Sequence, residues 1–281
     1  MNLRAILLLG TLAAVWFGCG GDSIEKLRAD GKKYYEQGNY EEARKRFVKA
    51  LAEKPSDQDL LFYAGLAYQK DYMYDSAIYY FKRADLMNPN NREINEEIYD
   101  VANKLADYPN AIAAINVLAE TGDGYDKYFE ELSYLYDKDD KPGQSFYWAR
   151  KAVVRGTDDP EIYMMAAGRA ADYDSIAVAL GMLDSAMIKW PDDPRFPGMK
   201  ALVLFHDGKY TQAEMILRPL AEQSPPGMEN YRLSLAQVLA SQNSKAKKKE
   251  ALGILEKIQP VMPPGSDVDT MIAELRRQLK E

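Results

Sequence analysis

A small residue recurs every 34 positions along most of this chain, and this recurrence constrains the fold more than any other feature. The members of the series are Ala43, Ala77, Ala111, Ser145, Ala179 and Ala213. Ala251 extends the series after a four-residue insertion. A fixed period of about 20 to 50 residues marks a repeat protein, in which each unit buries its apolar face against the next. The period therefore predicts an array of similar units rather than one closed core.

The stretch Gln58–Asn91 shows the pattern most completely. When it is numbered from 1, small residues fall at positions 8, 20 and 27, large apolar or aromatic residues at 4, 11, 17 and 24, and proline at 32. These residues are Gly65, Ala77, Ala84, Leu61, Tyr68, Tyr74, Phe81 and Pro89. The pattern resembles the tetratricopeptide repeat (TPR), which is a pair of antiparallel helices, A and B, in about 34 residues. We expect the small residues to let the two helices approach closely, and Pro89 to end helix B.

The 34-residue frame predicts an all-α chain, a right-handed α-solenoid of seven TPR helix-turn-helix repeats with a capping helix at its end. The predicted repeats cover residues 24–57, 58–91, 92–125, 126–159, 160–193, 194–227 and 228–265. Residues 266–281 form the expected cap, because a terminal repeat has no next repeat to bury its apolar face. We expect one continuous array without a linker.

The first 18 residues predict a lipoprotein signal peptide. Ala5–Phe17 is a 13-residue apolar run, and the only cysteine of the chain, Cys19, follows it closely. Thirteen residues are too few to span a bilayer but suit a signal peptide. The arrangement resembles a bacterial lipobox, which implies a lipidated Cys19 and a short tether over residues 19–23. The alternatives are an ordinary cleaved signal and an uncleaved anchor.

Lipidation implies a protein of the bacterial cell envelope. Gly20 follows the cysteine where aspartate would favour the inner membrane, so we expect an outer-membrane protein that faces the periplasm. The net charge of −7 argues against a nucleic-acid partner, which needs a basic surface.

No catalytic or cofactor motif stands out. The sequence has no glycine-rich phosphate loop, no GxSxG and no HExxH, and its single histidine, His206, excludes a histidine-rich metal site. We therefore expect no enzyme activity, no catalytic residue, no cofactor and no metal.

Positions 2, 5, 9 and 12 of each helix A share one helical face, which predicts a groove for partners. Its acidic part comprises Glu93, Glu96, Asp100 and Glu130, and its apolar part comprises Met164, Leu202, Phe205 and Leu239. The acidic part is suited to steer a Lys/Arg-rich segment, and the apolar part to hold an amphipathic helix or extended peptide. The alternatives are a plain solvated surface for the first, and internal packing or coverage by the capping helix for the second.

A run of lysines, Lys245 and Lys247–Lys249, follows the insertion in the seventh repeat. It is either a solvated turn or a site for anionic headgroups or an acidic partner.

The resemblance extends to the TPR lipoproteins of bacterial envelopes, which are adaptors. It implies a membrane-anchored scaffold that binds other envelope proteins through its groove, in an envelope, pilus or outer-membrane assembly complex. The alternative is a lipoprotein that binds a glycan or peptidoglycan, which would need a cluster of exposed aromatic side chains.

Overall fold

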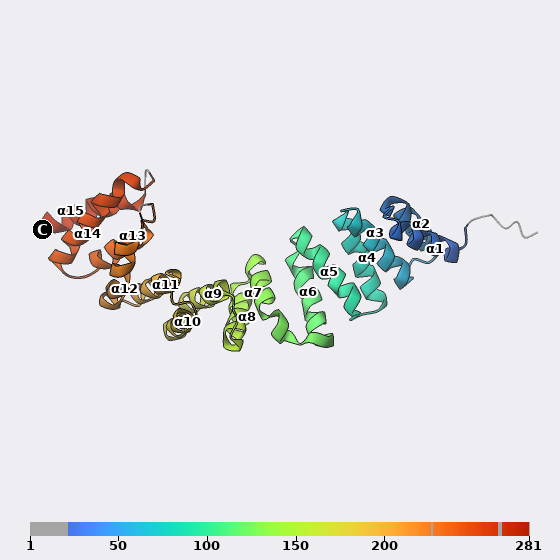
Figure 1. The fold of residues 1–281 in the computed structure, drawn as a ribbon, viewed down its shortest axis with the longest axis horizontal. Coiled ribbons are helices and arrows are strands. Elements are labelled where there is room, and N and C mark those ends of the chain that lie inside the picture. The colour runs from blue at the N-terminus through green and yellow to red at the C-terminus, as the bar shows by residue number, and fades with distance from the viewer. Residues whose placement is uncertain (1–21, 226, 264–265, 281) are drawn as a thin grey trace, which may run out of the picture. The chain divides into compact units, whose positions relative to one another are not determined.

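The computed structural model describes residues 22–225, 227–263 and 266–280. Within these ranges the chain forms fifteen α-helices and three short segments of other helical types, and no β-strand (Figure 1). Within each of the two units described below, successive α-helices pack against one another, as the 34-residue period predicts for an α-solenoid. Cys19 and the apolar run before it lie outside the described residues.

The chain divides into two compact units, of which the first ends at Asp107 and the second begins at Tyr108. The boundary lies inside the third predicted repeat, where Tyr99 occupies the position held by Gly31 and Gly65 in the first two repeats. Tyrosine there departs from the small residue that the repeat pattern places at this position.

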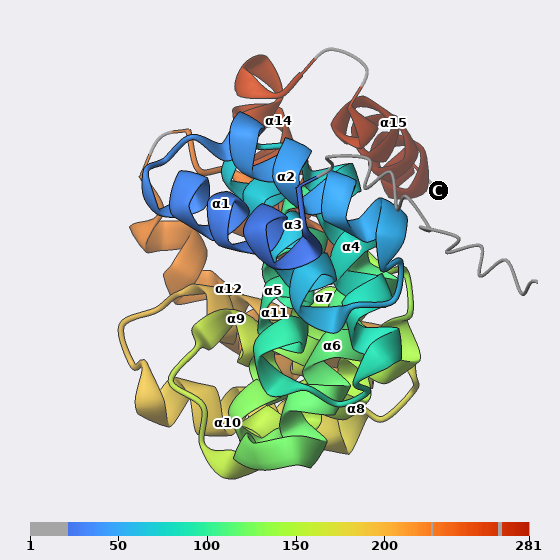
Figure 2. The same cartoon turned by 90° about the vertical axis from the view of Figure 1, so that its right-hand side faces the viewer.

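The first unit contains five α-helices (Figures 1 and 2). They are α1 (Ile24–Glu36), α2 (Tyr40–Glu53), α3 (Gln58–Lys70), α4 (Tyr74–Met87) and α5 (Arg92–Leu105). Side-chain caps fix where several of them begin. The Ser23 hydroxyl accepts a hydrogen bond from the Lys26 amide at 3.2 Å, and Asp57 caps α3 by accepting from the Leu60 amide at 3.1 Å.

Glycine permits the close approach of the helices in the first two pairs. A β-carbon built on Gly31 would stand 2.6 Å from the ring of Phe47, and one on Gly65 would stand 2.6 Å from the ring of Phe81. Both rings are fully buried. The role expected for these small residues is therefore confirmed.

The second unit contains ten α-helices among its described residues. They are α6 (Tyr108–Leu118), α7 (Phe129–Lys138), α8 (Pro142–Arg155), α9 (Pro160–Asp172), α10 (Ile176–Lys189), α11 (Arg195–His206), α12 (Tyr210–Gln223), α13 (Asn230–Ala240), α14 (Lys245–Ile258) and α15 (Asp267–Lys280). Two buried apolar clusters hold it together. One joins α7 to α11 around Phe129, Leu183 and Phe196, and the other joins α11 to α15 around Leu204 and Leu255.

The last helix, α15, packs on α14 and buries Val268, Ile272 and Leu275. Its charged residues include Asp269, which is exposed. It has the polar exterior expected of a cap.

The chain between α6 and α7 is irregular. Two of the three short non-α segments lie here: Ala119–Asp123 is π-helical, and Tyr125–Tyr128 is a 3₁₀ turn. The third is Gln259–Val261, which follows α14. Gly124 between them has φ +71° and ψ 159°, a conformation that side-chain-bearing residues rarely adopt. Helix A of the fourth predicted repeat consequently begins at Phe129, although the 34-residue frame starts that repeat at residue 126.

None of the described helices is long and apolar enough to cross a membrane.

Candidate functional site

The helix-A face of the first unit begins with charges that neutralise one another. Arg28 of α1 pairs with Asp57 at 2.5 Å and lies 3.6 Å from Asp59, which also pairs with Lys32 at 3.2 Å. The Lys32 ammonium lies 4.0 Å from the centre of the Tyr63 ring. These contacts tie α1 to the start of α3, so the basic pair of the first repeat supports the packing of the unit.

The predicted acidic residues of this unit share α5. The Nε2 atom of Gln69, a buried residue of α3, donates to Glu97 at 2.7 Å and to Asp100 at 2.8 Å. Asp100 also pairs with Lys104 at 2.5 Å, and Glu96 pairs with Arg92 at 2.9 Å. Glu93 is exposed. Two of the three predicted carboxylates therefore already have a cationic partner on their own helix.

Sequence reasoning missed Gln69, which draws two carboxylates together. A neutral amide in a helix gives no signal of its own, and its two partners follow 28 and 31 residues later.

Burial, with Tyr40 and Glu97 nearby, raises the pKa of Tyr35 at the same face. The arrangement concentrates negative charge beside aromatic rings, a setting suited to a cationic side chain.

Glu130 is the predicted acidic residue of the second unit. It lies in the first turn of α7, and it accepts a hydrogen bond from the Thr157 hydroxyl. Glu130 and Thr157 line a depression of about 360 Å³ together with Arg155 and Asp158. The depression carries both signs of charge, which makes it a mixed polar surface.

The predicted apolar residues Met164 of α9 and Leu202 and Phe205 of α11 lie on two helices of the second unit that contact each other. Met164 and Phe205 are half-buried, and Leu202 is 39% exposed. Gly168 lets the helices approach, because a β-carbon there would stand 3.0 Å from the Met199 methyl group. Arg195 of α11 also pairs with Glu161 of α9. We refer to Met164, Met199, Leu202 and Phe205 as the apolar strip.

Leu239, predicted as a fourth apolar groove residue, is fully buried. It belongs to the cluster that also contains Leu204 and Leu255, and it offers no surface to a partner. The reason is that α13 buries four of its last six residues, Leu235, Ala236, Val238 and Leu239. The position that is half-buried in α11, at Phe205, is therefore fully buried here. The apolar strip therefore does not continue onto α13.

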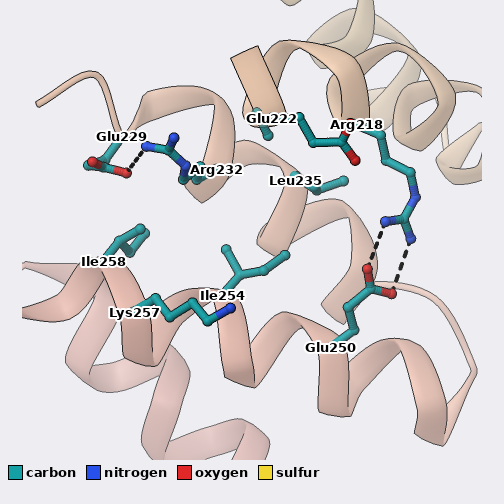
Figure 3. Close-up of a pocket in the computed structure, with 10 residues that line it drawn as sticks. Arg218, Glu222, Glu229, Arg232, Leu235, Glu250, Ile254, Lys257 and Ile258 are labelled. Atoms are coloured by element: carbon teal, nitrogen blue, oxygen red, sulfur yellow. Dashed lines mark hydrogen bonds and ion pairs between the residues drawn. The ribbon is translucent and has the colours of Figure 1, made fainter. Parts of the chain in front are cut away.

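A pocket of about 540 Å³ lies among α12, α13 and α14 (Figure 3). Leu235, Ile254 and Ile258 supply apolar lining. Around them, Arg218 pairs with Glu250 at 2.7 Å, and Arg232 pairs with Glu229 at 2.6 Å. We call this the α12–α14 pocket. Apolar lining between fixed ion pairs suits an amphipathic side chain, such as one from a bound peptide.

Arg218, which forms one of the two ion pairs of the pocket, also contacts a buried carboxylate, Glu214 of α12, which is 7% exposed. It accepts hydrogen bonds from Arg218 at 2.7 Å, from Gln242 at 2.7 Å and from Lys247. Burial alone would raise the pKa of Glu214, but these three donors outweigh it and lower the pKa to about 2. Glu214 thus links α12 to the inserted segment and to the start of α14.

One member of the lysine run is accounted for by this contact. Lys247 is held by Glu214, whereas Lys245 and Lys249 are exposed. The ion pair joins residues 33 positions apart, so the lysine run gives no hint of it in sequence.

Among the residues that the structure describes, no group of three or more histidine, cysteine, aspartate or glutamate side chains is arranged to hold a metal ion.

The family model described as TPR repeat matches residues 31–71 of this chain. No curated protein matches it in sequence. Among solved structures, the C-terminal part of a TPR repeat-containing protein from Cytophaga hutchinsonii is 14% identical and superposes with a TM-score of 0.55, over 87% of this chain and 98% of that one.

The structure of Naa15/Naa10 bound to HypK-THB is also similar, with 16% identity and a TM-score of 0.65. The match covers 87% of this chain, which spans only 38% of the other. At these identities the likeness concerns the fold. The chain therefore resembles the TPR proteins, in sequence over residues 31–71 and in fold over most of its length.

Proposed function

We propose that the protein is a membrane-tethered scaffold that binds another envelope protein through its helix-A faces. TPR proteins act in general as scaffolds for protein–protein interaction. The similar solved structure, that of Naa15/Naa10, is of a complex bound to HypK-THB. The tether is the lipidated Cys19 expected from the sequence, on the periplasmic face of the outer membrane.

The apolar strip is the observation that carries this proposal. Leu202 is 39% exposed on α11, Phe205 follows it three residues later on the same helix, and Met164 lies on α9, which contacts α11. Apolar side chains lined up on adjacent helix-A faces match the way in which an amphipathic helix or an extended peptide is bound in a groove. The acidic face of α5 supplies a second, charged surface for the same class of partner.

Crosslinking and capture on native membranes tests the proposal, with the wild type beside Leu202→Glu. The matched control is Val178→Glu, because Val178 is 41% exposed and lies on α10, outside the strip. We expect a protein that crosslinks to the wild type and to the Val178 variant but is lost from the Leu202 variant. Equal recovery from all three chains would refute a partner site at the apolar strip.

A further inference from the structure

Two outer helices carry the same eight-residue pattern, two repeat periods apart. Residues 79–86 of α4 read YYFKRADL, and residues 147–154 of α8 read YWARKAVV. Both begin with tyrosine and a second aromatic residue, continue with two cations and an alanine, and end in an aliphatic residue. The pattern lies in helix B, so it belongs to neither the apolar strip nor the α5 face.

The first, fifth and eighth residues of the pattern share one face of the helix. In α4 that face exposes 55% of Tyr79 and 71% of Leu86, and in α8 it exposes 52% of Tyr147 and 80% of Val154. The alanines of the two patterns, Ala84 and Ala152, are buried. Both helices therefore turn a tyrosine, a cation and an aliphatic side chain toward solvent in the same order.

In each pattern the cation lies against the ring of the exposed tyrosine. Arg83 is 5.4 Å from the centre of the Tyr79 ring, and the Lys151 ammonium is 4.9 Å from that of Tyr147. Because the cation occupies a face of the ring, the ring is poorly placed to stack on a sugar. What the pair presents is a fixed positive charge with apolar surface on both sides.

The patch on α8 is the more basic of the two. The helix contains Arg150, Lys151 and Arg155 and no acidic residue, in a chain whose net charge is −7. Within the described part of the chain, neither Arg150 nor Lys151 has a carboxylate within ion-pair distance. Arg155 pairs with Asp126. The patch thus retains positive charge in an acidic protein.

The aromatic residues beneath the α8 patch are fixed. Trp148 stacks on Tyr125 with ring centres 5.4 Å apart and an interplanar angle of 15°, and Lys151 lies 5.5 Å from the rings of both Phe129 and Trp148. Beside them is a depression of about 330 Å³, lined by Asp126, Phe129, Arg150, Lys151, Val154 and Arg155. Three cations and one carboxylate surround its apolar side chains, so the lining keeps a net positive charge that suits an anionic headgroup with the start of its acyl chain.

We propose that the outer face of α8 binds the surface of an anionic lipid bilayer, and that α4 carries a second, weaker copy of the same contact. The cations would meet lipid phosphates, Tyr147 would lie at the level of the headgroups, and Val154 would enter the boundary of the acyl chains. A bilayer is favoured over an acidic protein because Leu86 and Val154 are 71% and 80% exposed beside the cations, as expected of side chains that enter the boundary of a lipid layer. The inference rests on the membrane tether of the proposed function, which would keep these helices near lipid.

A fluorophore placed in the patch tests the contact directly. In the full chain with Cys19→Ser, Val154→Cys supplies the sole thiol for an environment-sensitive dye, and Leu202→Cys provides the matched label on the helix-A face. Vesicles of phosphatidylcholine with phosphatidylglycerol should shift the emission of the dye at residue 154 to the blue and allow brominated lipids to quench it. The dye at residue 202 should change little, and pure phosphatidylcholine should give a weaker effect at residue 154.

Arg150→Glu combined with Lys151→Glu, in the labelled chain, should raise the lipid concentration for the half-maximal shift about tenfold or more. If this variant loses helicity, Tyr147→Asp replaces it, since Tyr147 is half exposed. An absent shift at residue 154, an equal shift at residues 154 and 202, or a shift that needs an added protein would overturn the bilayer contact. The capture experiment on Leu202 is independent of these outcomes, because it uses no vesicles and tests partner binding at the helix-A face.

Discussion

Gly65 lies against the ring of Phe81 so closely that a β-carbon on it would stand 2.6 Å from two ring atoms. Gly31 and Phe47 stand in the same relation one repeat earlier. In both pairs the glycine occupies position 8 of a 34-residue repeat and the phenylalanine position 24. Helix A and helix B of these repeats are held at a separation that no other residue type at position 8 permits.

Gly65→Ala should therefore destabilise the protein. The added methyl group has no room, and overpacking of a core typically costs about 1–3 kcal/mol. The measurement is the urea midpoint followed by circular dichroism. Gly253→Ala in α14 is the control, since nothing lies within 4 Å of its added β-carbon. Alanine is the better helix former, so this change should stabilise by about 0.5–1 kcal/mol. Two variants that shift in the same direction would contradict the close contact.

Glu214 should make the stability of the second unit depend on pH. Its pKa falls from 4.5 to about 2 on folding, so the carboxylate contributes its full stabilisation above about pH 4.5. That contribution, on the order of 3 kcal/mol from the shift in pKa, should disappear as the pH falls from about 4.5 to about 2.

The comparison is between the wild type and Glu214→Gln, with urea midpoints taken at several pH values. The variant should be less stable at neutral pH, and its midpoint should change less across the acid range. Glu222→Gln, which alters an exposed carboxylate on the same helix, should follow the wild type. If the urea midpoints of the wild type and of Glu214→Gln change with pH in the same way, the buried hydrogen bonds do not lower the pKa of Glu214.

Gln69→Leu should destabilise the first unit by about 1–3 kcal/mol, because Glu97 and Asp100 would lose the donor that lies between them. Gln58→Leu, at the start of the same helix, is the matched control and should stay within about 0.5 kcal/mol of the wild type. Thermal and urea unfolding of both variants and the wild type at neutral pH measures the difference, and equal midpoints for all three would contradict a structural role of Gln69.

Cys19→Ser should release the protein from membranes. Lipid chains contribute about 0.8 kcal/mol for each buried CH₂, so their loss removes most of the attachment. Fractionation of cells, followed by detection of the protein in soluble and membrane fractions, measures the release. Retention of the variant in the membrane fraction would speak against lipidation and for an uncleaved anchor.

The period of the small residues was enough to predict the helix pairs. Gly65 and Phe81 could be assigned to facing positions because the repeat fixes where each helix turns its small and large residues. Ser23 at the start of α1 is also read from local chemistry, since a hydroxyl before a helix caps its free amides. Features that depend on one helix or on one repeated contact are thus visible in the sequence.

The candidate site was predicted only in part. Leu202 is exposed as the frame requires, but Leu239, which is equivalent to the half-buried Phe205, is fully buried, because α13 turns that side of the helix into the core. Gln69 and Glu214 gather charged groups from positions about 30 residues away. Such contacts are decided by side-chain directions in the assembled helices, which the hydrophobic pattern of one segment does not contain.

The boundary after Asp107 has a practical meaning for anyone who divides this protein into fragments. A cut between repeats, after Asn91, would strip α5 from the helices on which it packs and would uncover Ile94, Ile98 and Val101, all of which are buried. A cut after Asp107 leaves that helix in place. The repeats of the sequence and the compact units of the structure thus end at different residues.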